Sequence, residues 1–278
     1  MKTLIKILPI ILLTHCSTND ENFIKSQDGV DIYFERSGRG VPTIIFIHGW
    51  SPNSKAWKEQ VDFFSKKYSV INLDLPGFGK SGHNRSEWTI ENYGADIKTI
   101  IERLNLKRVI LVGHSMGGLV ALSGANKIPD KIEGIVLVDI LNDINYHYSE
   151  PQIQEIITSW KGKIKKGNLK ELSSFFSKPE LTERYSDLLP SDIPDYWWDV
   201  LTDSFHWINN ESKATLKGTR APVLSINSDR TKTDIEAFRQ YCPNYNAEII
   251  SGTTHYLNWD KPNEFNDTLL KCIESMDR

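Results

Sequence analysis

The chain has 278 residues, of which 39% are hydrophobic and 25% are charged, and its formal net charge is −3 at pH 7. This composition is typical of a globular protein with a sizeable core, and the length suits one large α/β domain or two smaller ones. No block of Lys or Arg stands out, so a nucleic-acid partner is not indicated. The three cysteines, Cys16, Cys242 and Cys272, lack a metal-binding spacing, and the sequence leaves open whether the last two pair.

The N-terminus has the pattern of a signal peptide. Lys2 and Lys6 precede an apolar run over residues 7–13, and Cys16 follows that run. The run is about half the length needed to span a bilayer. The stretch LLTHC resembles a bacterial lipoprotein signal, in which cleavage precedes the cysteine and its thiol is diacylated. We therefore expect a signal peptide over 1–15, a lipid anchor at Cys16 and a solvated tether over 16–29. The protein would then lie in the bacterial cell envelope, on the periplasmic side or the cell surface; secretion without an anchor and an uncleaved N-terminus are the alternatives.

From residue 30 onward, predicted strands alternate with predicted helices. Strands are indicated by short alternating or continuous apolar runs, and helices by apolar residues three or four positions apart. The predicted strands are 30–38, 43–49, 68–74, 108–114, 133–139, 222–227 and 247–252. The clearest predicted helices are 54–67, 89–105 and 116–128. Such alternation implies a mainly parallel sheet that helices cover on both faces.

Residues 140–218 interrupt this alternation. The segment is rich in aromatic residues and prolines, and its pattern suggests several short helices. It is too long for a loop without structure of its own. We expect a helical cap over the carboxyl edge of the sheet, where ligands bind in open parallel sheets. The core would then consist of residues 30–139 and 219–278.

The stretch GHSMG, residues 113–117, places a serine between a predicted buried strand and a predicted helix. It fits the G-x-S-x-G nucleophile elbow, whose required context is a strand before the serine and a helix after it. A turn this sharp brings the backbone on either side of Ser115 so close that side chains two residues away would collide. Gly113 and Gly117 are therefore expected on steric grounds.

Four motifs in this order resemble those of the α/β-hydrolase family, in particular its small lidded esterase and haloperoxidase-like branch. They are IHGWSPNSKAW (47–57), DLPGFGKSG (74–82), GHSMG (113–117) and GTTHYLNWDKPNEFN (252–266). The resemblance covers about residues 30 to 276. It implies an eight-stranded, mostly parallel sheet with the helical cap inserted after the sixth strand, and a hydrolase chemistry based on serine, histidine and an acid.

Serine chemistry assigns roles to these motifs. A serine hydroxyl is a weak nucleophile unless a base takes its proton, and a third group must orient that base. Ser115 is the predicted nucleophile, and His255, in the loop after the last predicted strand, is the predicted base. The resemblance implies an oxyanion hole formed by the backbone N–H groups of Trp50 and Met116. His48 and His114, beside motif glycines, are expected to make structural hydrogen bonds.

The acid is harder to assign from the sequence. In the family it usually follows the strand before the histidine loop, in a pattern like G-x-x-D-x-x-x-P. Here Ser228 stands where the glycine is expected and Thr233 where the proline is expected, and counting back from Thr233 selects Asp229. The alternative acid is Asp139, which ends the earlier strand GIVLVD, and Asp234 is a third candidate.

The sequence therefore predicts a serine hydrolase that cleaves a small or medium apolar carboxylic ester through an acyl-enzyme intermediate. Amide, lactone or C–C bond hydrolysis and perhydrolysis are alternatives on the same triad, and a ligand-binding receptor with slow turnover is an alternative of another class. No metal or organic cofactor is expected. The expected partners are a small-molecule ester and, through Cys16, a membrane; the pattern specifies neither the ester nor the oligomeric state.

Overall fold

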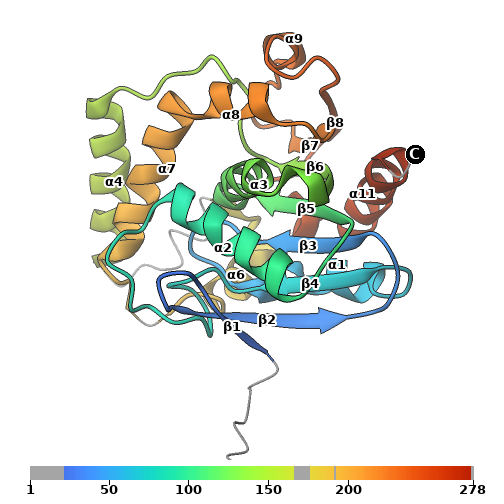
Figure 1. The fold of residues 1–278 in the computed structure, drawn as a ribbon. Helices are drawn as coiled ribbons and strands as arrows, with labels where there is room; N and C mark the ends of the chain where they lie inside the picture. The colour runs from blue at the N-terminus through green and yellow to red at the C-terminus, as the bar shows by residue number, and fades with distance from the viewer. Residues whose placement is uncertain (1–21, 166–175, 191, 277–278) are drawn as a thin grey trace, which may run out of the picture.

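The computed structural model describes residues 22–165, 176–190 and 192–276. Within them an eight-stranded sheet is covered by helices on both faces (Figure 1). The strands lie in the order β1-β2-β4-β3-β5-β6-β7-β8. Their bounds are β1 Phe23–Lys25, β2 Asp31–Ser37, β3 Thr43–Ile47, β4 Ser69–Leu73, β5 Val109–His114, β6 Ile132–Val138, β7 Val223–Ser228 and β8 Asn246–Ile250. β2 is antiparallel to both of its neighbours and the other pairs are parallel, which confirms the predicted mostly parallel sheet.

Strand β1 lies inside the segment expected to be a tether. Phe23 pairs with Tyr33 and Lys25 with Asp31, so this segment forms the edge of the sheet instead of a free linker. The tether prediction over 16–29 is therefore wrong from residue 23 onward. The signal peptide over 1–15 and Cys16 lie outside the described residues.

Helices on each face of the sheet bury one of two hydrophobic cores. In Figure 1, α2 (Ile90–Arg103) and α3 (Met116–Lys127) lie in front of the sheet, and α1 (Lys58–Phe64) and α11 (Pro262–Met276) lie behind it. Alternate residues of one strand enter opposite cores, as strand geometry requires: Ile45 and Ile47 face the core of α2 and α3, and Phe46 faces that of α1 and α11. Because both faces are covered, β3 to β6 are almost wholly buried, which explains their continuous apolar runs.

The remaining helices are short or belong to the cap. Between β6 and β7 lie α4 (Glu150–Lys165), η3 (Pro179–Leu181), α6 (Thr182–Ser186), α7 (Tyr196–Asn210) and α8 (Ser212–Gly218). The core adds η1 (Ser54–Trp57), η2 (Pro129–Lys131), α9 (Ile235–Arg239) and α10 (Leu257–Asp260). The position of the cap after the sixth strand is as predicted.

Contacts from the loop after β3 hold the cap over the sheet. The indole nitrogen of Trp50 donates a hydrogen bond of 2.6 Å to the carbonyl oxygen of Trp197 in α7. The hydroxyl groups of Ser51 and Tyr185 share a hydrogen bond in the same region. These contacts place the aromatic cap directly above the loop that the sequence assigned to the oxyanion hole.

The structure also bears on membrane-spanning helices and on the two cysteines Cys242 and Cys272. In the described part of the chain, no helix is both long and apolar enough to cross a membrane. Cys242 and Cys272 are both buried and both are free thiols, which answers the question of their pairing.

Candidate active site

Ser115 occupies a sharp turn between β5 and α3. Its backbone has φ 53° and ψ −126°, a conformation that non-glycine residues rarely adopt. A Cβ atom on Gly113 would lie 2.2 Å from the carbonyl oxygen of Gly117, and one on Gly117 would lie 2.4 Å from that of Ile47. The predicted collision within the turn is confirmed for Gly113, whereas Gly117 must be small because the backbone at the end of β3 approaches it.

Left-handed backbone concentrates around this serine. Among the described residues, five that are not glycine have a positive φ: Ser51, Asn105, Ser115, Asp139 and Leu141. All but Asn105 lie at the carboxyl ends of β3, β5 and β6. Such conformations cost about 1–3 kcal/mol each and persist where the surrounding structure enforces them, which is common at functional sites.

The register of the sheet brings Ser115 and Asp139 to neighbouring strand ends. His114 in β5 pairs with Val138 in β6, and the next residue of each strand leaves the sheet at its carboxyl edge. The N–H of Ser115 donates to the carbonyl of Val138 at 2.8 Å, and that of Asp139 donates to the carbonyl of Ile226 in β7 at 3.1 Å. Both residues are thus fixed by the ladder of the sheet.

His255 contacts Asp139. Its Nδ1 donates to Asp139 Oδ2 at 2.7 Å, while Asp139 Oδ1 accepts from the backbone N–H of Ser228 at 2.9 Å and from its hydroxyl at 2.8 Å. Burial raises the pKa of the Asp139 carboxyl, but the hydrogen bonds from His255 and Ser228 outweigh it and hold that pKa below its ordinary value. Asp139 is therefore an oriented carboxylate, which leaves Nε2 of His255 free for a proton.

Asp229 does not contact His255, which corrects the first choice of acid. Both of its carboxylate oxygens accept from the N–H of Gly252 at 3.0 Å, and its side chain is exposed. Consecutive residues at the end of a strand point in opposite directions, so Ser228 faces Asp139 and Asp229 faces the loop after β8.

Asp234, the third candidate for the acid, is also placed elsewhere. It accepts from the N–H of Ala237 and caps α9. Ser228, which the sequence presented only as a departure from an expected glycine, is the residue that fixes Asp139. Its place at the end of the strand next to Asp139 was the available signal for this role.

Two buried histidines support the loops of the site. Nε2 of His114 donates to the carbonyl of His255 at 2.8 Å, and burial together with the nearby His255 lowers the pKa of His114 to about 3. The N–H of Leu75 donates to Nε2 of His48 at 2.9 Å, so Nδ1 carries the proton and donates to the carbonyl of Gly49 at 2.8 Å. Burial lowers the pKa of His48 as well. The structural role predicted for both is confirmed.

The loop after β3 packs closely against Ser115. A Cβ atom on Gly49 would lie 3.2 Å from the Cβ of Ser115, and Trp50 follows directly. Met116 begins α3, so its N–H has no partner within the helix. Within the described part of the chain, neither the N–H of Trp50 nor that of Met116 has an acceptor, and no hydrogen bond joins the Ser115 hydroxyl to His255.

A cavity of about 580 Å³ opens beside His255, and we call it the His255 cavity. Its walls come from the loop after β6 (139–143), from the loop after β7 (230–232), and from the cap. The cap contributes mainly aromatic side chains, and the ring of Phe176 lies with its centroid 5.5 Å from that of His255. The site therefore has a chamber directly next to the imidazole that Asp139 orients.

Comparisons with known proteins agree with this architecture. Residues 42–167 match the sequence profile of the family described as alpha/beta hydrolase fold. The uncharacterized hydrolase YugF of Bacillus subtilis is 35% identical over 113 residues, which are 40% of this chain and 41% of that protein. The chain thus aligns with about two fifths of the length of this relative.

Two solved structures resemble the chain over almost their whole length. The esterase EaEST from Exiguobacterium antarcticum has a TM-score of 0.76 at 20% identity and is covered to 99%, with 91% of this chain. The bromoperoxidase from Bacillus anthracis has a TM-score of 0.74 at 23% identity, with the same coverage. The chain has the α/β-hydrolase fold.

Proposed function

We propose that the chain is a serine hydrolase that cleaves small or medium apolar carboxylic esters. Ser115 is the nucleophile, His255 is the general base, and Asp139 orients the His255 ring and stabilises its charged form. The backbone N–H groups of Trp50 and Met116 form the oxyanion hole. The observation that carries the proposal is the bond of 2.7 Å between His255 Nδ1 and Asp139 Oδ2, beside a serine held in an elbow.

The reaction proceeds in two halves. The Ser115 hydroxyl turns toward Nε2 of His255, gives it a proton and attacks the carbonyl carbon of the ester. The oxyanion that forms accepts hydrogen bonds from the backbone N–H groups of Trp50 and Met116. When the C–O bond breaks, His255 gives its proton to the departing alcohol and an acyl-enzyme remains. Water then attacks the acyl group with His255 as base, and the carboxylic acid leaves with Ser115 restored. A hydrogen bond that is absent before substrate binds is compatible with this role, because such contacts tighten in the complex.

The choice of an ester has two supports. The E. antarcticum protein, whose fold this chain shares, is described as an esterase. The His255 cavity offers aromatic walls to an apolar substrate. Hydrolysis of an amide or a lactone would use the same attack, so a panel of these substrates separates the alternatives.

A fluorophosphonate probe tests the proposal. We expect the probe to label Ser115, and Ser115→Ala to abolish labelling and to lower ester turnover by about 10⁴-fold or more. Ser275→Ala in α11 is the matched control and should change neither. Turnover that persists in Ser115→Ala would refute the assignment. Labelling of Ser115 without turnover of any ester, lactone or amide in the panel would favour a ligand-binding receptor instead.

We also propose that Cys16 carries a lipid anchor that holds the protein at the bacterial cell envelope. The support is the sequence pattern of the first 16 residues. In a bacterial host the protein should partition with membrane lipoproteins into a detergent phase. Cys16→Ser should release it or block its processing, whereas Cys242→Ser should not. A mature protein that starts at another residue would overturn the proposal.

A further inference from the structure

The His255 cavity carries two positive charges on one wall. Arg230 and Lys232 line it from the loop after β7, and among the described residues neither has a carboxylate within ion-pair distance. Two carboxylates share the lining. Asp139 is committed to His255 and Ser228. Asp143 accepts a hydrogen bond from the N–H of Asn145 at 2.9 Å and forms no ion pair with either cation.

The position of the cavity identifies the half of the substrate that it holds. Its lining contains His255 but, among the described residues, not Ser115, Trp50 or Met116. The acyl carbon must lie at Ser115 and the two N–H groups, whereas His255 must reach the oxygen of the departing alcohol to protonate it. Because the chamber contacts His255 and none of the groups that would hold the acyl carbon, it suits the alcohol half better than the acyl half.

The part of the lining that the cap contributes is mainly apolar. Phe176 lies next to His255, and Tyr148 and Ile208 extend the surface from the cap. A molecule that fills this space has an apolar or aromatic body against the cap and a polar end at Arg230 and Lys232. A carboxylate suits that end, because guanidinium and ammonium groups donate charge-assisted hydrogen bonds to it.

We propose that the substrate is an ester whose alcohol half has an apolar, preferably aromatic, body and a carboxylate that pairs with Arg230 and Lys232. The inference rests on the proposed function, since it assigns the alcohol half through the acid role of His255. The proposed function specified only an apolar ester, and this inference adds a negative charge to the alcohol half of that ester. It also makes Arg230 and Lys232 specificity-determining residues.

A matched pair of acetate esters tests the proposal. 4-Acetoxybenzoate releases an anionic alcohol, and 4-acetoxybenzamide releases a neutral alcohol of nearly the same size. We expect kcat/KM to favour the benzoate by about fivefold to twentyfold, and Arg230→Gln with Lys232→Gln to bring the ratio to about one or below. About 0.5 M salt should also lower the ratio, because the interaction is electrostatic.

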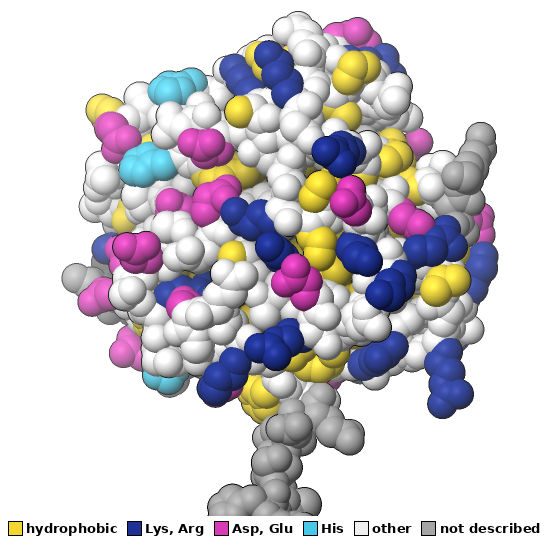
Figure 2. Space-filling view, viewed as in Figure 1, with side chains coloured by type: hydrophobic (Ala, Val, Ile, Leu, Met, Phe, Trp, Pro, Cys, Tyr) yellow, Lys and Arg dark blue, Asp and Glu magenta, His cyan; other side chains and the backbone are white. Residues whose placement is uncertain are grey.

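Two further variants sharpen the test. Asp143→Asn removes the opposing charge from the cavity and should raise the ratio. Arg103→Gln is the matched control, since Arg103 is exposed at the end of α2, which precedes β5 and so lies at the amino edge of the sheet. Figure 2 shows Lys and Arg side chains gathered on the right-hand side, where β3 and β5 begin, so a general effect of surface charge would appear in this control.

Failure of this inference differs from failure of the proposed function. If neither ester is cleaved in a Ser115-dependent way, the proposed function fails, and calorimetric binding of 4-hydroxybenzoate against 4-hydroxybenzamide then tests the cavity alone. Tighter binding of the benzoate that is lost in the double variant supports the inference. The proposal is overturned if wild-type protein shows no preference for the anion in turnover or binding, or if the double variant keeps the preference.

Discussion

Asp139 and Asp229 show how the direction of a side chain at the end of a strand decides which carboxylate contacts His255. Each directly follows a parallel strand, β6 for Asp139 and β7 for Asp229, and both lie near the histidine loop. Asp139 turns inward with a left-handed backbone and meets His255, whereas Asp229 turns outward and holds the N–H of Gly252. Counting residues in a motif does not reveal which way the side chain points.

This difference predicts a ranking of two isosteric variants. Asp139→Asn keeps the shape but removes the charge that stabilises the His255 imidazolium, and the comparable change in serine proteases costs about 10⁴ in turnover. Asp229→Asn keeps one carbonyl oxygen for Gly252 and should cost about tenfold or less. Steady-state kinetics with a neutral ester measures both, and circular dichroism checks that each variant folds.

The opposite ranking would return the role of the acid to Asp229. Equal and small losses would contradict both assignments. Ser228→Ala offers an independent check, because it removes one of the two hydrogen bonds from Ser228 to Asp139 Oδ1 and leaves the backbone bond. It should lower turnover less than Asp139→Asn does.

At the scale of elements, the sequence predicted what local pattern determines. The buried strands and α2 and α3 follow from apolar runs and helical spacing, and the glycines at 113 and 117 follow from the close approach of the backbone. Strand β1 was missed because three residues in a polar segment have no pattern of their own and are strands only through pairing with β2. Motifs selected Ser115 and His255 as candidates. Which carboxylate contacts His255 depends on the direction of a side chain, and the cap lining depends on packing between distant helices.

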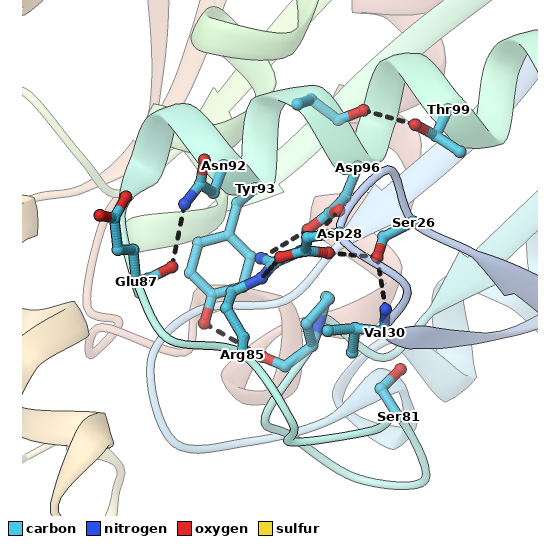
Figure 3. Close-up of polar contacts among 12 residues, drawn as sticks. Ser26, Asp28, Val30, Ser81, Arg85, Glu87, Asn92, Tyr93, Asp96 and Thr99 are labelled. Atoms are coloured by element: carbon cyan, nitrogen blue, oxygen red, sulfur yellow. Dashed lines mark hydrogen bonds and ion pairs between the residues drawn. The ribbon is translucent and has the colours of Figure 1, made fainter.

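A buried ion pair joins that unpredicted edge strand to the core (Figure 3). Arg85 makes two hydrogen bonds of 2.9 Å to Asp96 in α2 and reaches Asp28, in the turn between β1 and β2, at 2.6 Å. The side chains of Arg85 and Asp96 are only 2% and 3% exposed, whereas that of Asp28 is 44% exposed. Arg85 thus ties three segments together from a site that water barely reaches.

Removal of Arg85 should strongly destabilise the fold. Arg85→Met leaves the buried Asp96 carboxylate without its partner, which should lower the free energy of unfolding by about 3–5 kcal/mol. Arg85→Met combined with Asp96→Leu removes both charges and should recover most of that loss. Urea unfolding of the single and double variants measures the difference.

The exposed pair Arg220–Asp130, with side chains 74% and 85% exposed, supplies the control. Arg220→Met should change stability by less than about 0.5 kcal/mol. A double variant that is no more stable than Arg85→Met would show that the ion pair contributes net stability in its buried setting.

For the whole molecule, the buried histidines beneath the site link stability to pH. The pKa of His114 is lowered to about 3 by burial and by the nearby His255, compared with about 6.5 for an unfolded chain. Between about pH 6.5 and pH 3, His114 therefore binds a proton in the unfolded chain but not in the folded protein. The free energy of unfolding falls accordingly as the pH decreases from about 6.5 toward 3, by about 1.4 kcal/mol per pH unit for this one residue. His48 is fully buried and acts in the same direction.

His114→Gln isolates the contribution of His114. The amide nitrogen of Gln can donate to the carbonyl of His255 as Nε2 does, but the side chain does not titrate. At pH 7.5 the wild type should be the more stable protein, and its advantage should shrink by about 2 kcal/mol between pH 7.5 and 5. Denaturant unfolding at several pH values measures this gap, and the contributions of His48 and of the carboxylates cancel in it. Thr99→Val, which alters no titrating group, should keep a constant gap to the wild type. A gap between wild type and His114→Gln that stays constant over the same range would show that His114 takes up its proton in the folded protein.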